Sequence, residues 1–202
     1  WVNQIHFITW GHLPEWLNTE CPKLHIVNHR DYIPEKYLPT FSSHPIELNL
    51  HRIPNLSEHF VYFCDDMLLN NAVTPDFFFR KGKPCDFLQC RHIHFASAND
   101  IYAHITTNDV MEINRHYSYI KTFLLHPWKI MSRNYGVSIC LKNILKLGNV
   151  HRFVGFQNHH LPTSYIKQTF LDVWSAMPER MDKVSGNRFR TPFDVSQSVF
   201  RY

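Results

Sequence analysis

The stretch FVYFCDDMLL at residues 60–69 decides the fold prediction, because a run of large apolar residues ends in two adjacent acids. Five consecutive strand-forming residues are typical of a strand buried on both faces, as in parallel or mixed sheets. In open α/β sheets a ligand binds beyond the carboxyl ends of the strands, and Asp65 and Asp66 occupy such an end. The stretch therefore predicts an α/β fold with a mixed sheet and a candidate site at the two acids.

The two acids also limit the chemistry of this site. Adjacent carboxylates repel each other and lose hydration on burial, so a bound cation or basic neighbours usually compensate them. Their hard oxygen atoms suit Mg²⁺ or Mn²⁺. The alternative is a loop whose acids cap the next turn and face water. The strand context alone leaves the two interpretations equally open.

A helix and two strands are predicted before this stretch. Alternating apolar residues predict strands near 4–9 and 23–29. Ser42 and Ser43 are good N-cap residues, Pro45 fits a first helical turn, and the apolar positions that follow recur at helical spacing. These signals predict a helix over about 44–53. This helix and the strand that follows it would together place Asp65 and Asp66 at the edge of the sheet.

The second half of the chain changes character, because helical periodicity dominates from about residue 106. The segments that carry it are 108–123, 137–147 and 164–176. A chain of 202 residues suits one substantial core, and no low-complexity linker divides it. We therefore expect a single domain over 1–202, with an α/β part in 1–100 and a mainly helical part in 101–202 that packs on the same sheet.

Charge and hydropathy argue against two classes of protein. The formal net charge is +4 with the 15 histidines neutral, which favours anionic ligands. No dense Lys/Arg block is interleaved with aromatic residues, so nucleic acid is not an expected partner. No stretch approaches the roughly 20 apolar residues of a membrane span, and no charged-then-apolar leader precedes the first strand. We expect no transmembrane segment, which leaves peripheral membrane association open.

Motifs around the acid stretch resemble the Stealth family. These are sugar-phosphate transferases of bacterial capsule and cell-surface polysaccharide synthesis, and the animal lysosomal-enzyme N-acetylglucosamine-1-phosphotransferase belongs with them. The similar motifs start near Ile5 and include PEWL at 14–17, VNHRD at 27–31, LPTFSSHPIE at 38–47 and LHRIPNLSE at 50–58. Together they resemble the second conserved region of the family. A block at 135–195 resembles the third region, whose hallmarks are a His-x-Pro and a Phe-Arg followed by an acid.

The chain departs from the family pattern in three places. The first region, implicated in holding the nucleotide-sugar donor, would lie before Trp1, so we expect an N-terminal segment to be lacking. The fourth region has no counterpart before Tyr202. The family usually has Asn-Asp-Asp where this chain has Cys64-Asp65-Asp66. A thiol donates a hydrogen bond more weakly than an amide, so this exchange either tunes the site or marks its decline.

The resemblance implies a fold similar to a nucleotide-sugar (GT-A-like) transferase core, and it implies a phosphotransferase. Such an enzyme moves a sugar 1-phosphate from a nucleotide diphosphate sugar, with a UDP-sugar favoured, to a hydroxyl of a glycan acceptor. The product is a phosphodiester. The expected location is the bacterial cytoplasm, including the inner face of the membrane.

The reaction needs a cation on the diphosphate, a base for the acceptor proton and a fixed positive charge on the moving phosphoryl group. The resemblance assigns Asp65 and Asp66 to Mg²⁺ or Mn²⁺ and to the donor, with Asp66 in the catalytic set. His160 is the candidate general base, because an imidazole titrates near neutral pH. Chemistry alone does not exclude His159, and the His-x-Pro spacing selects His160.

Arg190 is the candidate phosphoryl contact, since its planar fork matches phosphate oxygens, and Arg188 is a close competitor. Arg30 and Arg52 are further candidates for the donor diphosphate, with a solvated side chain as the alternative for each. Asp194 resembles a family position and could orient Arg190. It is placed equally well as an N-cap that opens the final helix, and we prefer the cap.

Two other functions use the same residues. A metal-dependent glycosyltransferase would need the same acids but would release nucleoside diphosphate. A non-catalytic module that binds glycan or nucleotide is the second alternative, and it is favoured if the polypeptide starts at Trp1.

Overall fold

The computed structural model describes residues 1–145 and 151–201. The chain forms two compact units that interleave in sequence. The first unit consists of Trp1–Cys85 and Pro162–Arg190, and the second of Asp86–Leu161 and Thr191–Tyr202. The sequence analysis divided the chain once, near residue 100, whereas the structure returns residues 162–190 to the first unit.

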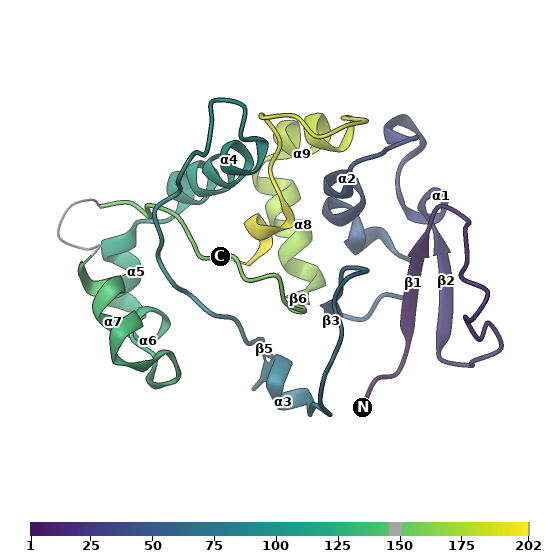
Figure 1. Cartoon of the computed structure of the whole chain (residues 1–202), viewed down its shortest axis with the longest axis horizontal. Helices are drawn as coiled ribbons and strands as arrows, with labels where there is room; N and C mark the ends of the chain where they lie inside the picture. The colour runs from purple at the N-terminus through teal and green to yellow at the C-terminus, as the bar shows by residue number, and fades with distance from the viewer. Residues whose placement is uncertain (146–150, 202) are drawn as a thin grey trace. The chain divides into compact units, whose positions relative to one another are not determined.

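Strands of both orientations occur in the first unit, so the predicted α/β class is confirmed. β1 (Ile5–Thr9) pairs in parallel with β2 (Leu24–Asn28), and the two lie side by side in Figure 1. β3 (His59–Tyr62) pairs antiparallel with β6 (Thr163–Ile166), and β4 (Phe79–Arg80) with β5 (Lys83–Pro84). Among the described residues, the strands form two-stranded sheets. The likeness to a nucleotide-sugar transferase core stays a prediction.

The helices of the first unit are short before β3 and longer after β6. They are α1 (His29–Tyr32), η1 (Glu35–Tyr37), α2 (Ser43–Leu48), η2 (Leu50–Arg52), α3 (Pro75–Phe78), α8 (Lys167–Ala176) and α9 (Pro178–Ser185). The helix predicted over 44–53 is divided into α2 and η2, because the fully buried Asn49 breaks it. The side-chain amide of Asn49 donates through Nδ2 to the Pro45 carbonyl at 2.8 Å and to Ser185 Oγ at 3.1 Å.

The core of the first unit joins the β3–β6 pair to α8 and α2. The ring of Phe60 lies 5.7 Å from that of Tyr165 and 5.6 Å from that of Phe170 between centroids. Trp174 Nε1 on α8 donates to the Leu48 carbonyl on α2 at 2.8 Å. The predicted strand exists but is shorter and less buried than predicted, because β3 ends at Tyr62 and its residues are half-buried or exposed. Cys64 and the two acids therefore lie in a loop.

The second unit is helical, as predicted for much of this part of the chain. Its helices are α4 (Ile101–His116), α5 (Tyr119–Leu125), α6 (Pro127–Ile130), η3 (Arg133–Tyr135), α7 (Gly136–Leu145) and η5 (Gln197–Phe200). The segment predicted over 108–123 is two helices, α4 and α5. The end of the 137–147 prediction lies outside the described residues. The segment at 164–176 begins as β6 and becomes α8 in the first unit.

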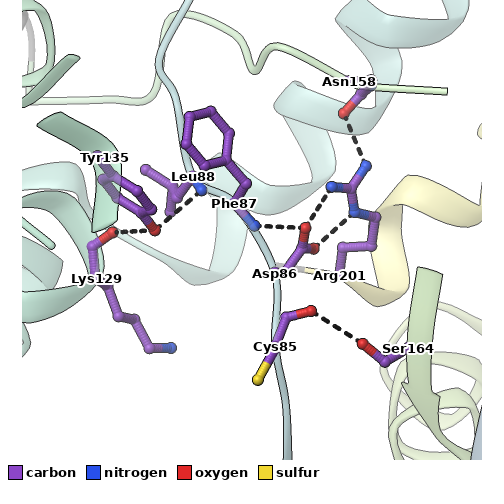
Figure 2. A network of polar contacts seen from close by, with 9 residues as sticks. All are labelled: Cys85, Asp86, Phe87, Leu88, Lys129, Tyr135, Asn158, Ser164 and Arg201. Carbon is purple, nitrogen blue, oxygen red and sulfur yellow. Dashed lines mark hydrogen bonds and ion pairs between the residues drawn. The ribbon is translucent and has the colours of Figure 1, made fainter. Parts of the chain in front are cut away.

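Buried polar side chains organise the second unit. Asn143 is fully buried, donates to the carbonyls of Leu88 (3.1 Å) and Ile130 (2.9 Å), and accepts from the Cys90 amide (2.9 Å). Figure 2 shows the guanidinium of Arg201 facing the carboxylate of Asp86, with N···O distances of 2.6 and 2.7 Å. These contacts fix the segment after Cys85 within this unit. Across the described residues, no helix has both the length and the apolar character that a membrane crossing requires.

Candidate functional site

The β3–β6 ladder fixes where the two acids leave the sheet. Tyr62, the last residue of β3, lies opposite Thr163, the first residue of β6, in an antiparallel register. Asp65 and Asp66 follow Tyr62 by three and four positions, and both are exposed. His160 precedes Thr163 by three positions and is also exposed. The acid loop therefore begins at this end of the ladder in the first unit, whereas His160 belongs to the second unit.

A buried carboxylate lies behind the acid loop. Glu47 on α2 is only 5% exposed and accepts a hydrogen bond from the Tyr62 hydroxyl at 2.9 Å. The Cys64 thiol donates to the oxygen of the same hydroxyl at 3.4 Å. This chain of contacts joins α2 to the residue that precedes Asp65 and Asp66. Glu47 was not among the predicted site residues, and the signal that could have indicated it is an acid on the buried face of a short helix.

The acids create a negative electrostatic environment at the start of the loop. Burial raises the pKa of the Tyr62 hydroxyl, and the nearby charge of Glu47 raises this pKa further. Burial also raises the pKa of the Cys64 thiol, and the charges of Glu47, Asp66 and Asp65 add to this rise, partly opposed by the hydrogen bond with Tyr62. The thiol is therefore held in its protonated form. Clustered carboxylates that disfavour a further negative charge suit a divalent cation with hard oxygen ligands, so the residues present fit Mg²⁺ or Mn²⁺.

Arg190 is attached to the start of α2. Its Nη2 atom donates to Ser43 Oγ at 2.9 Å. The preceding residues run beside the segment before α2, because the Phe41 amide donates to the Arg188 carbonyl at 2.8 Å. The rings of Phe41 and Phe189 stack there with centroids 5.3 Å apart. These contacts bring Arg190, distant in sequence, to the first turn of α2.

Helix α2 thus holds both sets of candidate residues in the first unit. Ser43 and Glu47 are four positions apart, so their Cβ atoms lie about 5–6 Å apart on one face of the helix. Ser43 contacts Arg190, and Glu47 contacts Tyr62, which contacts Cys64 of the acid loop. The guanidinium of Arg190, a candidate phosphate contact, and the candidate metal-binding loop of Asp65 and Asp66 are therefore attached to the same face of α2, one turn apart.

The other two candidate arginines stack on tryptophans. The Arg52 guanidinium lies 4.8 Å from the Trp174 ring centroid, and its Nε donates to Asn49 Oδ1 at 2.9 Å. These contacts give Arg52 a structural role. The Arg30 guanidinium lies 5.1 Å from the ring centroid of Trp10, just beyond the carboxyl ends of β1 and β2. The predicted contacts of both arginines with the donor stay predictions.

Asp194 and His159 occupy positions in the second unit. Asp194 is fully buried, and its carboxylate accepts from the Thr191 amide at 3.0 Å and from the Thr191 hydroxyl at 2.8 Å. The preferred N-cap role for Asp194 was wrong, because Ser196 caps the final helix by accepting from the Ser198 amide at 3.1 Å. The ring of His159 packs edge-on against Phe87 with centroids 5.3 Å apart. The choice of His160 as the candidate base stays a prediction.

Comparisons with known proteins cover the whole chain. Residues 1–86 match the profile of Stealth protein CR2, conserved region 2. The chain is 38% identical over 202 residues to the capsular polysaccharide phosphotransferase WcwK of Streptococcus pneumoniae and spans 60% of that protein. It is 38% identical over 207 residues to the exopolysaccharide phosphotransferase cps2G of Lactiplantibacillus plantarum, of which it spans 59%. It is 31% identical to the capsular polysaccharide phosphotransferase fcs1 of Haemophilus influenzae, of which it spans 48%.

In each of these matches, essentially all of the present chain is aligned. The chain spans about three-fifths of the length of the first two relatives and about half of the third. The resemblance drawn from the sequence motifs is confirmed by the profile match and by the relatives. Residues 1–86 match conserved region 2 of the Stealth family, and essentially the whole chain is similar to bacterial polysaccharide phosphotransferases.

Proposed function

We propose that the protein containing this chain transfers a sugar 1-phosphate from a nucleotide diphosphate sugar to a hydroxyl of a glycan acceptor. The reaction would serve capsule or exopolysaccharide synthesis, as the names of its relatives indicate for those proteins. One observation carries the assignment of residues: Arg190 and the loop of Asp65 and Asp66 are attached to one face of α2. A diphosphate bound there would contact the guanidinium of Arg190 and lie near the carboxylates of Asp65 and Asp66.

Asp65 and Asp66 would hold Mg²⁺ or Mn²⁺, with the remaining coordination positions left to water and the donor diphosphate. Such an ion neutralises the charge of the diphosphate and of the leaving nucleotide. Burial raises the pKa of the Cys64 thiol most, and the nearby carboxylate charges that add to this rise support the choice of a cation, which would offset them. A UDP-sugar is the favoured donor.

His160 would act as the general base. The acceptor hydroxyl gives its proton to the imidazole as its oxygen attacks the phosphorus that carries the sugar. The new O–P bond completes the phosphodiester, and the O–P bond to the nucleotide breaks, which releases nucleoside monophosphate. The His-x-Pro motif at 160–162, which resembles that of the family, supports this role.

Arg190 would bind the non-bridging oxygens of the transferred phosphoryl group. A guanidinium offers five N–H donors in a plane, and the contact with Ser43 uses one of its nitrogens. The other donors can bind two phosphoryl oxygens at once, which a lysine ammonium cannot match in geometry. Charge that develops on these oxygens in the transition state would be stabilised by a group already in place.

The product tests the reaction class. The full-length protein is incubated with a UDP-sugar, a glycan acceptor and Mg²⁺, and the nucleotide is identified by chromatography. UMP together with a phosphodiester-linked sugar supports the proposal. UDP would instead identify a glycosyltransferase, and donor binding without turnover in a folded protein would identify a binding module.

A further inference from the structure

We propose that Ser43 is a positioning residue that holds the guanidinium of Arg190 toward the phosphoryl group. The inference rests on the proposed function, because it concerns how Arg190 is presented for that reaction. Ser43 is half-buried at the first position of α2, and its hydroxyl oxygen lies 2.9 Å from Arg190 Nη2.

Arg190 needs a holding contact because its side chain is long and exposed. A free arginine side chain samples many rotamers, and ordering it costs conformational entropy. The backbone on either side of the contact is already fixed. The Phe41 amide binds the Arg188 carbonyl, and the rings of Phe41 and Phe189 stack. The hydrogen bond from Arg190 to Ser43 extends this fixed segment to the guanidinium itself.

A serine suits this task better than an acid would. The hydroxyl of Ser43 is neutral, so it orients the guanidinium without cancelling its positive charge. A carboxylate in the same place would form an ion pair and would compete with the phosphoryl oxygens for the N–H donors. Ser43 therefore fixes the direction of Arg190 and leaves its charge available to the substrate.

The place of Ser43 on α2 also sets Arg190 relative to the acid loop. Ser42 caps the helix by accepting from the His44 amide, which fixes the first turn. Glu47, one turn further along, contacts Tyr62 and through it the thiol of Cys64. Loss of the Ser43 hydroxyl should therefore release Arg190 while the acid loop keeps its own attachment.

The experiment uses the full-length protein with four variants: Ser43→Ala, Ser43→Thr, Arg190→Ala and the double variant Ser43→Ala/Arg190→Ala. We expect Ser43→Ala to lower kcat about tenfold and to change the donor KM less than about twofold, because the contact orients a group that acts in the transition state. Ser43→Thr keeps the hydroxyl and should restore kcat to within about threefold of the original. The exposed Ser175 on α8 provides the matched control Ser175→Ala, which should leave both constants unchanged.

The double variant separates positioning from a general effect on the fold. If Ser43 acts through Arg190, adding Ser43→Ala to Arg190→Ala should reduce kcat by less than about twofold. A further tenfold loss in the Arg190→Ala background would overturn the inference. An equal loss of kcat in Ser43→Ala and Ser43→Thr would overturn it as well.

A second measurement does not depend on turnover. Phenylglyoxal modifies exposed guanidinium groups, and mass spectrometry reports its rate at each arginine. Ser43→Ala should make the modification of Arg190 faster and leave that of Arg188 unchanged. Equal rates at Arg190 in a folded variant would contradict the contact. If the unaltered protein forms no phosphodiester, the proposed function fails and the positioning role fails with it. The rate of phenylglyoxal modification of Arg190 would still decide whether Ser43 holds this side chain.

Discussion

Two buried carboxylates, one in each unit, show how differently an acid can be used. Glu47 is 5% exposed and Asp194 is 0% exposed, so burial alone does not distinguish them. Asp194 accepts two hydrogen bonds from Thr191, three residues away, and closes a local turn. Glu47 accepts from Tyr62 in another element, and its charge raises the pKa values of Tyr32, Tyr62 and Cys64 after the larger effect of burial.

The comparison separates a carboxylate that stabilises its own loop from one whose field reaches a candidate site. The charge of Glu47 acts, together with those of Asp66 and Asp65, on the Cys64 thiol in the loop that carries the two candidate metal-binding acids. The two hydrogen bonds from Thr191 give Asp194 a role in the stability of its own turn. Variants on each side of this comparison should therefore change different properties.

The largest effect is expected at Asp66, in the exposed loop that follows Cys64. Asp66→Asn should lower metal-dependent phosphotransfer about 100-fold or more, because a neutral amide is a poor ligand for a divalent cation and lacks the charge. The fold should survive, since Asp66 is exposed. Metal-dependent donor binding, measured by calorimetry with and without Mg²⁺, checks this. Unchanged binding in a folded variant would remove Asp66 from the site.

Asp194→Ala should act on stability. The amide and hydroxyl of the half-buried Thr191 would lose the fully buried carboxylate that accepts from them, which should lower the free energy of unfolding by about 2–3 kcal/mol. Urea unfolding of the full-length protein measures this change. Asp172→Ala removes an exposed acid that accepts from Gln168, and it should cost less than about 0.5 kcal/mol. Equal losses in the two variants would contradict the structural role of Asp194.

Tyr62→Phe should have a moderate effect, because it removes one hydrogen bond to the buried Glu47. We expect the free energy of unfolding to fall by about 1–2 kcal/mol. Glu47→Gln and the double variant complete a mutant cycle, and a coupling energy of about 0.5 kcal/mol or more is expected for groups in direct contact. If the changes in the free energy of unfolding of the two single variants simply add in the double variant, the Tyr62 hydroxyl and the Glu47 carboxylate do not interact. Tyr102→Phe, at an exposed position, is the matched control.

The smallest effect is electrostatic. The pKa of the Cys64 thiol is raised by burial and by nearby carboxylates, so its reactive thiolate forms only at more alkaline pH than usual. Glu47→Gln removes one negative charge and should move the midpoint of Cys64 alkylation to lower pH. Iodoacetamide labelling followed by mass spectrometry across a pH series measures it. Asp194→Asn should leave the midpoint unchanged, and a shift as large as that of Glu47→Gln would break the comparison.

Local signals in the sequence predicted much of the fold. The strands near 4–9 and 23–29 appear as β1 and β2, because alternation over a few residues depends little on distant parts of the chain. The helix predicted over 44–53 stops early, because the buried Asn49 binds Ser185, a partner 136 positions away. The cap at Asp194 was wrong for a related reason, since two residues with capping side chains are close together and only packing chooses between them.

The arrangement of the candidate site was less accessible from sequence. The acid loop and Arg190 could be named from motifs, but the contact between Arg190 and Ser43 joins residues 147 positions apart. Glu47 was not recognised, because its importance follows from the position of Tyr62 on another element. Spacing along the chain describes one helix or strand at a time, whereas these contacts depend on how elements pack together.

The most direct test of the account is a crystal structure of the full-length protein with a UDP-sugar and Mg²⁺. We predict an oxygen of Asp66 on the metal at about 2.0–2.1 Å and a phosphate oxygen on the same ion. The Arg190 guanidinium should lie about 2.7–2.9 Å from an oxygen of the sugar-linked phosphate while keeping its contact with Ser43. A diphosphate bound away from both Asp66 and Arg190 would contradict the claim that α2 assembles one phosphotransfer site.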